Sequence, residues 1–247
     1  MVLRVRPVGE IHAGVEFLGR QSGLIDAMAY GARSRKGSLR GLVVPFGVGT
    51  GYFYTDPVKG STKVTDLAID NYHPELRENL KKFYVATLWT ELTISSYAAG
   101  SEGEEVWTLL SSGLDLLSRG EEATADLVNL QFLWRFLGLL GMRPELPDGS
   151  GRQIYRPEEH RFVPAIAESE AGYTRDPRDP ESFDEQLGCS AGSLAYLAES
   201  SRRDLADSLS LNPSGTQRGE LKVLLFRLIQ EASERELKTI RSGRGIL

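Results

Sequence analysis

The sequence predicts an α+β protein in which a small N-terminal β-barrel precedes a mainly α-helical domain. Short runs of β-branched and aromatic residues recur at intervals of roughly ten residues before Tyr72, separated by Gly and Pro. After Tyr72 the apolar residues recur at three- and four-residue steps, which is the helical period. We therefore predict a barrel domain at residues 1–73 and a helical domain at residues 74–247.

Five or six strands are expected in the N-terminal segment. They are too few for an immunoglobulin-like sandwich and fit a small barrel of the OB or the SH3 type. The expected strands are Val2–Pro7, Val15–Leu18, Leu24–Tyr30, Leu42–Phe46, Gly51–Thr55 and Lys63–Ile69. The run Gly47–Gly51 lacks the Lys-Ser/Thr ending of a phosphate loop, so we interpret it as a glycine-kinked strand.

Helical periodicity then continues to the end of the chain with one interruption. The first helix is expected to run from Pro74 to about Ala98, and residues 124–140 are apolar on nearly all sides, as in a helix at the centre of a bundle. Further helices are expected at residues 104–118, 191–199, 202–209 and 216–239. Residues 143–188 show no convincing period and contain six prolines, so we expect an irregular insert.

Charge is distributed unevenly along the 247 residues. The net charge is −5, but residues 1–63 carry +5 and residues 64–247 carry −10, which suggests two parts with different partners. The single cysteine, Cys189, excludes an intrachain disulfide and favours a reducing, cytoplasmic location. No apolar run approaches the ~20 residues of a membrane span, so we expect no membrane partner.

The segment Tyr30–Phe46 has the composition of an anion-binding loop. Arg33, Arg35, Lys36 and Arg40 lie among Gly and Ser, and no carboxylate occurs anywhere in residues 27–55. Cations with backbone freedom and hydroxyl donors suit contacts to phosphates that do not depend on base sequence. The alternative is a solvated basic turn between two strands.

Further binding groups occur in the same domain. Arg4, Arg6 and Arg20 add cations, and aromatic rings could stack on unpaired bases. These rings belong to Tyr30, Phe46, Tyr52, Phe53 and Tyr54. Because side chains alternate along a strand, some of the last three must face the core.

No motif indicates catalysis. The three histidines, His12, His73 and His160, lie far apart and none has the spacing of a metal site, so each is expected in a turn or on the surface. Ser190 and Ser193 do not form the Gly-x-Ser-x-Gly turn of a hydrolase. We therefore expect no enzyme, no metal and no cofactor.

The basic segment resembles the RecO family of bacterial recombination mediators. The resemblance lies in Tyr30-Gly-Ala-Arg33, the basic Ser-containing linker, and Leu39-Arg-Gly-Leu-Val-Val-Pro-Phe46, and the basic closing residues 237–242 are also similar. It implies an OB-fold that binds single- and double-stranded DNA, anneals complementary strands and helps RecA load on strands coated by the single-stranded DNA-binding protein (SSB). It also implies RecR and the acidic C-terminal tail of SSB as partners, at the nucleoid of the bacterial cytoplasm.

The resemblance implies functional roles for only some residues of this sequence. Arg33, Arg35, Lys36 and Arg40 are the DNA-contact candidates. The family's Arg-Phe-Glu is replaced here by Gln131-Phe132-Leu133, so the SSB site is not assigned. Several family members carry a four-cysteine zinc module where this chain has residues 143–188, and we expect no zinc here. The alternative function is an OB-fold adaptor that binds RNA or protein without annealing activity.

Overall fold

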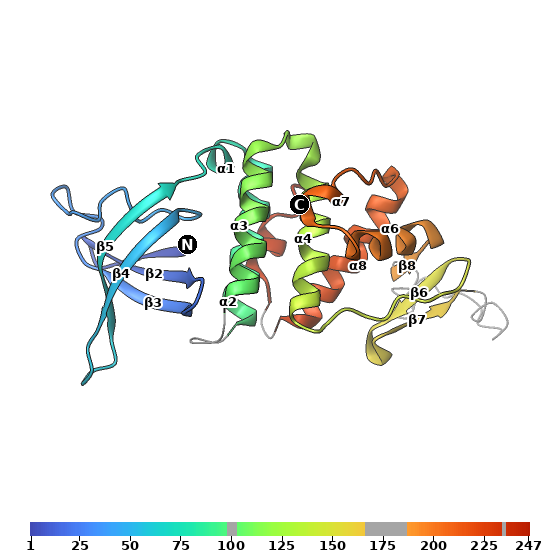
Figure 1. Ribbon diagram of the computed structural model, residues 1–247, viewed down its shortest axis with the longest axis horizontal. Helices are drawn as coiled ribbons and strands as arrows, with labels where there is room; N and C mark the ends of the chain where they lie inside the picture. Colours follow the sequence, from blue (N-terminus) through green and yellow to red (C-terminus); the bar gives the residue numbers. More distant parts are fainter. Residues whose placement is uncertain (98–102, 166–186, 234–235) are drawn as a thin grey trace. The chain divides into compact units, whose positions relative to one another are not determined.

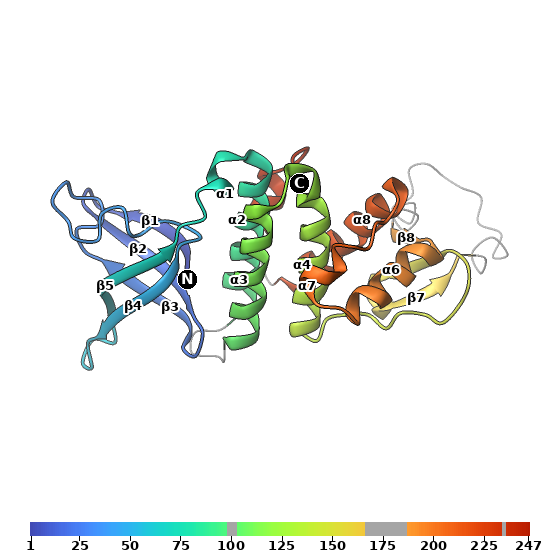
Figure 2. The ribbon, with the colours of Figure 1, turned by 45° about the horizontal axis from the view of Figure 1, so that its top comes forward.

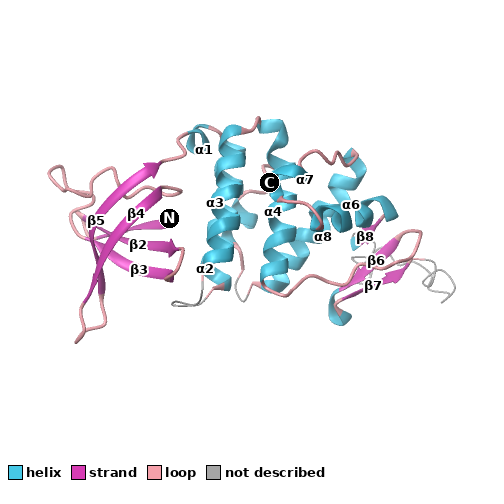
Figure 3. Ribbon diagram, in the orientation of Figure 1, coloured by secondary structure: helices cyan, strands magenta, loops and turns pink. Residues whose placement is uncertain are grey.

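The computed structural model describes residues 1–97, 103–165, 187–233 and 236–247, which form two compact units (Figure 1). The first unit comprises Met1–Ala125 and Ser233–Leu247, and the second comprises Asp126–Ala232. The predicted boundary at residue 73 lies inside the first unit, where it separates strands from helices (Figure 3). As a boundary between domains it stays a prediction.

The first unit begins with a five-stranded, mainly antiparallel barrel. Its strands are β1 (Val2–Val8), β2 (His12–Gly19), β3 (Gly23–Ala29), β4 (Val48–Thr55) and β5 (Thr62–Asn71). Their order is β1-β2-β3-β5-β4, with the β3–β5 pair parallel. The N–H of Val2 donates to the carbonyl of Gly47 at 2.8 Å and that of Phe46 to Val2 at 2.9 Å, which joins β1 to the start of β4. This is the OB-like barrel that the sequence predicts.

Alternating side chains fill the barrel. Val15 and Phe17 on β2 and Leu67 on β5 are buried, whereas Glu16 between the first two and Asp66 and Ala68 beside Leu67 are more exposed. Gly49 confirms the interpretation of residues 47–51 as strand, because a Cβ there would overlap the carbonyl oxygen of Ala68 on β5. The glycine therefore allows the two strands to approach.

The predicted strand Leu42–Phe46 is wrong. Turn bonds replace a ladder here, because the N–H of Val44 donates to Leu42 and that of Gly47 donates to Val44, at 3.1 and 3.2 Å. Leu42 and Val43 still pack against the barrel core. The apolar run thus covers the barrel interior from a loop, and Pro45, which has no N–H, would interrupt a ladder.

Helices complete the first unit: α1 (Glu75–Glu78), α2 (Leu80–Ser96), α3 (Glu104–Arg119), the short η1 (Glu122–Thr124) and α9 (Lys238–Ser242). One helix was expected from Pro74 to Ala98, but Asn79 divides it. Asn79 has extended backbone angles (φ −121°, ψ 120°), and its side chain accepts the N–H of Lys82 at 3.0 Å. An Asn in this geometry caps a new helix, so α2 starts there. Ala98 lies outside the described residues.

The second unit contains α4 (Ala125–Leu139), β6 (Gln153–Arg156), η2 (Pro157–Glu159), β7 (Arg161–Pro164), β8 (Gly188–Cys189), α6 (Ala191–Ser201), α7 (Leu205–Ser208) and α8 (Gly215–Ala232), most of which Figure 2 labels. Helix α4 is buried on nearly all sides, as its sequence predicts. It binds α6 through polar groups as well: Trp134 Nε1 donates to Ser201 Oγ at 2.8 Å and Gln131 donates to Ser200 Oγ at 2.9 Å. These partners satisfy polar atoms in an apolar helix.

The expectation of an irregular insert at 143–188 is only partly met in the described residues: residues 143–152 form neither helix nor strand, but short strands follow. Strands β7, β6 and β8 form a small antiparallel sheet around the buried Tyr155. Four-residue strands are too short to show a period in the sequence. Residues 166–186 lie outside the described residues.

The last predicted helix, 216–239, is also corrected, because two helices occupy this region. Helix α8 ends at Ala232, and α9 begins at Lys238. The N–H groups of Lys238 and Thr239 donate to the two carboxylate oxygens of Glu91 on α2, at 2.9 and 2.8 Å. A carboxylate at that position satisfies unpaired N–H groups of a helix start, so it fixes where α9 begins.

Cys189 should be unreactive while the protein is folded. It is fully buried in β8, and burial, aided by the charge of Glu220, raises the pKa of its thiol from 9.0 to about 12. The thiolate fraction is then on the order of a thousandfold lower than for a free thiol. We expect negligible labelling by a disulfide reagent at neutral pH and complete labelling in guanidinium. Rapid labelling of the folded protein would contradict this placement.

Candidate nucleic-acid interface

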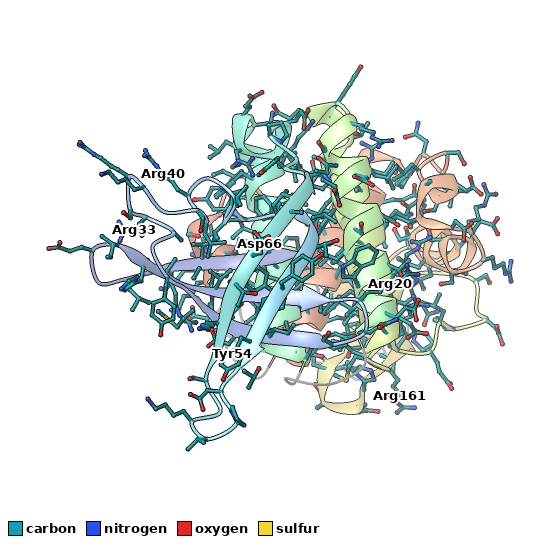
Figure 4. The ribbon with its side chains drawn as sticks, turned by 60° about the vertical axis from the view of Figure 1, so that its left-hand side comes forward. Arg20, Arg33, Arg40, Tyr54, Asp66 and Arg161 are labelled. Atoms are coloured by element: carbon teal, nitrogen blue, oxygen red, sulfur yellow. The ribbon has the colours of Figure 1, made fainter. Side chains whose placement is uncertain are left out.

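Residues 30–47 connect β3 to β4, and we call this segment the basic loop. It carries Arg33, Arg35, Lys36 and Arg40, and all four side chains are exposed. Figure 4 shows Arg33 and Arg40 on this loop, at the edge of the barrel. The structure thus brings the four predicted residues together on one connection.

The basic loop is folded by successive turns. The N–H groups of Ser34, Gly37 and Arg40 each donate to the carbonyl three residues earlier, at 2.9, 3.2 and 3.1 Å. Between the cations, Ala32 and Leu39 are buried and join the barrel core. Burial of these two side chains fixes the loop against the barrel while the charged side chains point to solvent.

The turn between β1 and β2 supports the first half of the loop. The N–H of Arg33 donates to the carbonyl of Ile11 at 3.0 Å, and its Nη1 donates to the carbonyl of Gly9 at 3.2 Å. The N–H of Gly31 donates to Nδ1 of His12 at 3.1 Å. His12 is therefore a positioning group for the loop rather than the isolated surface histidine that the sequence suggests.

The charge of the basic loop is not compensated. Among the residues that the structure describes, none of the four cations lies within ion-pair distance of a carboxylate. Arg40 Nη1 donates to the backbone carbonyl of Arg35 at 3.2 Å, which leaves its charge unpaired. Uncompensated, solvated cations on a fixed loop suit the phosphates of a nucleic acid.

The other arginines of the barrel are paired with carboxylates, so their charge is partly compensated, and the expectation that they add binding charge stays a prediction. Their partners are carboxylates: Arg4 pairs with Glu16 at 2.5 Å, Arg6 with Asp26 at 2.7 Å, and Arg20 with Glu104 at 2.9 Å. The hydrogen bond that Arg6 donates to Asp26 raises the pKa of Arg6 further. On this surface the positive charges of the arginines and the negative charges of their carboxylate partners offset each other.

A buried histidine holds the second end of the loop. His73 is 1% exposed, its Nδ1 donates to the carbonyl of Phe46 at 2.9 Å, and its Nε2 lies 2.8 Å from Oδ1 of Asp115 on α3. Its backbone N–H donates to the side chain of Asn71 at 3.0 Å. The sequence places His73 in a turn, which is correct, but no local pattern shows that it is buried against Phe46.

The aromatic residues divide into two groups. Phe46 is buried and Phe53 packs against the barrel core, so neither ring reaches a ligand. Tyr30, Tyr52 and Tyr54 are exposed. The alternation predicted for residues 52–54 is therefore confirmed, with the phenylalanine inside.

Neither a metal-binding cluster nor a membrane-spanning helix is found among the residues that the structure describes. No group of three or more His, Cys, Asp or Glu side chains is placed to hold a metal ion in residues 1–97, 103–165, 187–233 and 236–247. Over the same ranges, every helix is too short or too polar to cross a membrane. The basic loop is the feature on which a function can be argued.

Comparison with known proteins gives matches over both parts of the chain. The family model described as "Recombination protein O N terminal" matches residues 1–70, and the one described as "Recombination protein O C terminal" matches residues 77–241. Together they cover the barrel and most of the helical part.

Several curated relatives are each called DNA repair protein RecO. The one from Neisseria gonorrhoeae (strain NCCP11945) is 28% identical over 172 residues, which are 67% of this chain and 65% of that protein. The one from Desulfatibacillum aliphaticivorans is 30% identical over 59% of this chain and 57% of its own length. The one from Desulforamulus reducens is 24% identical over 97% of this chain and 90% of its own length. The chain thus spans just under two thirds of the Neisseria relative.

Proposed function

This chain belongs to the RecO family of DNA repair proteins, and from that premise we propose that it is a non-enzymatic mediator that binds single- and double-stranded DNA and anneals complementary strands. In the same proposal it assists the loading of RecA on SSB-coated DNA in the bacterial cytoplasm. The observation that carries the proposal is the basic loop, whose four cations are exposed and form no ion pair with a carboxylate of the described residues.

Annealing follows from contacts to the backbone alone. Two complementary strands repel each other through their phosphates, and cations that contact phosphates reduce this repulsion. Contacts to phosphates carry no base readout, so the bases stay free to pair. Arg33, Arg35, Lys36 and Arg40 would supply these contacts. No covalent step is needed, which is why we assign no catalytic residue.

We assign the DNA contacts to residues 1–73 and the protein contacts to residues 74–247. The barrel region carries the excess of positive charge, and the remainder of the chain is acidic. RecR and the C-terminal tail of SSB are the proposed partners, without assigned residues. In this assignment the small sheet β7-β6-β8 and the residues around it take the place of the zinc module of other family members.

An annealing assay tests the function directly. Two complementary oligonucleotides, one with a fluorophore and one with a quencher, are mixed with and without SSB, and the rate of duplex formation is followed. We expect this protein to accelerate annealing in both cases. With RecA added to SSB-coated single strands, ATP hydrolysis by RecA should start with a shorter lag.

The alternative outcomes are informative. Binding of DNA without faster annealing would overturn the mediator role and leave an adaptor that only holds the strand. Tight binding of RNA with weak binding of DNA would indicate an RNA adaptor. A capture experiment compares intact SSB with an SSB that lacks its C-terminal tail. If this protein captures neither of them, SSB is not a partner.

A further inference from the structure

Three tyrosines stand out on the surface of the barrel. Of the tyrosines that the structure describes, only Tyr30, Tyr52 and Tyr54 are exposed, with exposed fractions of 56%, 55% and 50%. Large rings at half exposure are available to a ligand without any change in the fold. The proposed backbone contacts of the basic loop do not use them.

The strand register places these rings on one face. Met28 of β3 is opposite Lys63 of β5, and Lys63 is opposite Tyr54 of β4, so the three form one row across β3, β5 and β4. Tyr30 directly follows β3, and its ring contacts that of His12, which lies on β2 two residues before Gly14, the partner of Met28. Tyr52 precedes Tyr54 by two residues on β4 and is likewise exposed. We call this surface the tyrosine face.

Positively charged side chains lie beside the tyrosine face at its Tyr54 end and at its Tyr30 end. Lys63 Nζ lies 5.0 Å from the ring centroid of Tyr54, a cation–π contact on the β4–β5 side. The ring of Tyr30 meets that of His12 edge-on at 5.1 Å, and Arg33 is three residues further along the basic loop. A strand that follows the loop cations onto this face therefore finds rings beside positive charge.

Neighbouring surfaces are less suited to a polyanion. The outer face of β1–β2–β3, the usual ligand surface of OB-folds, carries the self-paired Arg4, Arg6, Glu16 and Asp26. On β5 the exposed Asp66 lies opposite Tyr52, and Figure 4 shows Asp66 and Tyr54 on these adjacent strands. Its carboxylate disfavours a phosphate but not a base, so the backbone of a bound strand would run on the side of Lys63 and the basic loop.

We propose that Tyr30, Tyr52 and Tyr54 stack on unpaired bases and so add affinity for single-stranded nucleic acid that a duplex does not gain. The inference rests on the proposed function, because it divides one binding site into two roles. The loop cations contact phosphates of any strand. The rings contribute only where bases are unstacked, since a duplex keeps its bases inside.

The test compares two triple variants with the wild-type protein. In Tyr30→Leu/Tyr52→Leu/Tyr54→Leu the rings are lost, and in Tyr30→Phe/Tyr52→Phe/Tyr54→Phe they are kept without the hydroxyl groups. Affinities for a mixed-sequence single strand and for its duplex are measured by fluorescence anisotropy at several salt concentrations. Circular dichroism and thermal unfolding check that each variant is folded.

We expect the Leu variant to bind the single strand roughly tenfold more weakly or worse, and to bind the duplex as the wild type does within about twofold. Its salt slope should match the wild type, and the Phe variant should retain single-strand affinity. Unchanged single-strand affinity in the Leu variant would overturn the inference, as would an equal loss on the duplex. A Phe variant as weak as the Leu variant would also overturn it, by assigning the effect to hydroxyl groups.

These outcomes separate the inference from the proposed function. If the wild type binds both forms of DNA and the Leu variant binds each form as tightly as the wild type does, the stacking role of the tyrosine face is refuted and the mediator role stands. If the wild type binds neither form, both are refuted. If the inference holds, single Tyr→Leu variants show how much each ring contributes to single-strand affinity.

Discussion

Replacing Arg33, Arg35, Lys36 and Arg40 together by Ala should remove most of the affinity for single- and double-stranded DNA and flatten its salt dependence. The slope of log K against log salt is negative, and each lost phosphate contact reduces its magnitude by about 0.9 on duplex DNA and about 0.7 on single strands. The quadruple variant should therefore differ most from the wild type at low salt. Titrations between 50 and 200 mM salt, on the scale where such effects are large, give both quantities.

The fold should tolerate this change. All four side chains are exposed and none is ion-paired to a carboxylate in the part of the chain that the structure describes. The variant loses the exposed hydrogen bonds of Arg33 to Gly9 and of Arg40 to Arg35, but Ala32 and Leu39 in the core and the backbone turns still hold the loop. Thermal unfolding of the variant should stay close to that of the wild type, so a loss of binding reports on the contacts.

A matched control comes from the same barrel. The variant Arg4→Ala/Arg6→Ala removes two cations that are paired with Glu16 and Asp26, and Arg33→Ala/Arg35→Ala removes two that are not. Both doubles change the net charge equally. We expect the second to weaken DNA binding much more than the first. Equal weakening would show that overall charge, not the basic loop, governs binding.

Replacing His73 by Ala should lower the free energy of unfolding of the protein measurably. The imidazole is 1% exposed, and without it the carbonyl of Phe46 keeps no partner on that side. An unsatisfied buried polar group costs about 1–3 kcal/mol, and the cavity left by the ring adds to this. Chemical denaturation, with the free energy of unfolding extrapolated to water, measures the sum.

The same variant should also affect binding. Because His73 fixes the end of the basic loop, DNA affinity should fall while the salt slope stays, since no phosphate-contacting cation is removed. Asp115→Asn is the control, as this side chain is 41% exposed and water can replace its contact. A His73→Ala protein as stable as Asp115→Asn would show that the buried contact to Phe46 contributes little.

Local patterns gave the barrel and most helices correctly because each depends on neighbours in the chain. Alternation along the strand predicted that some of the rings at residues 52–54 face the core, which the structure shows to be Phe53, and helical spacing predicted the all-round burial of α4. Local patterns failed where tertiary contacts decide. Leu42–Phe46 has the composition of a strand, but its apolar side chains cover the barrel core from a loop.

By itself the sequence determined that this chain has an N-terminal barrel, a helical remainder and a loop with four cations and no carboxylate nearby, because composition and period are properties of contiguous residues. Only the tertiary structure decided which cations are free. Arg6 meets Asp26 across 20 residues and Arg20 meets Glu104 across 84, whereas the loop cations meet no carboxylate in the described residues. Pairing and burial depend on side chains that are distant in sequence and adjacent in space, so only the fold separates neutralised arginines from those available to DNA.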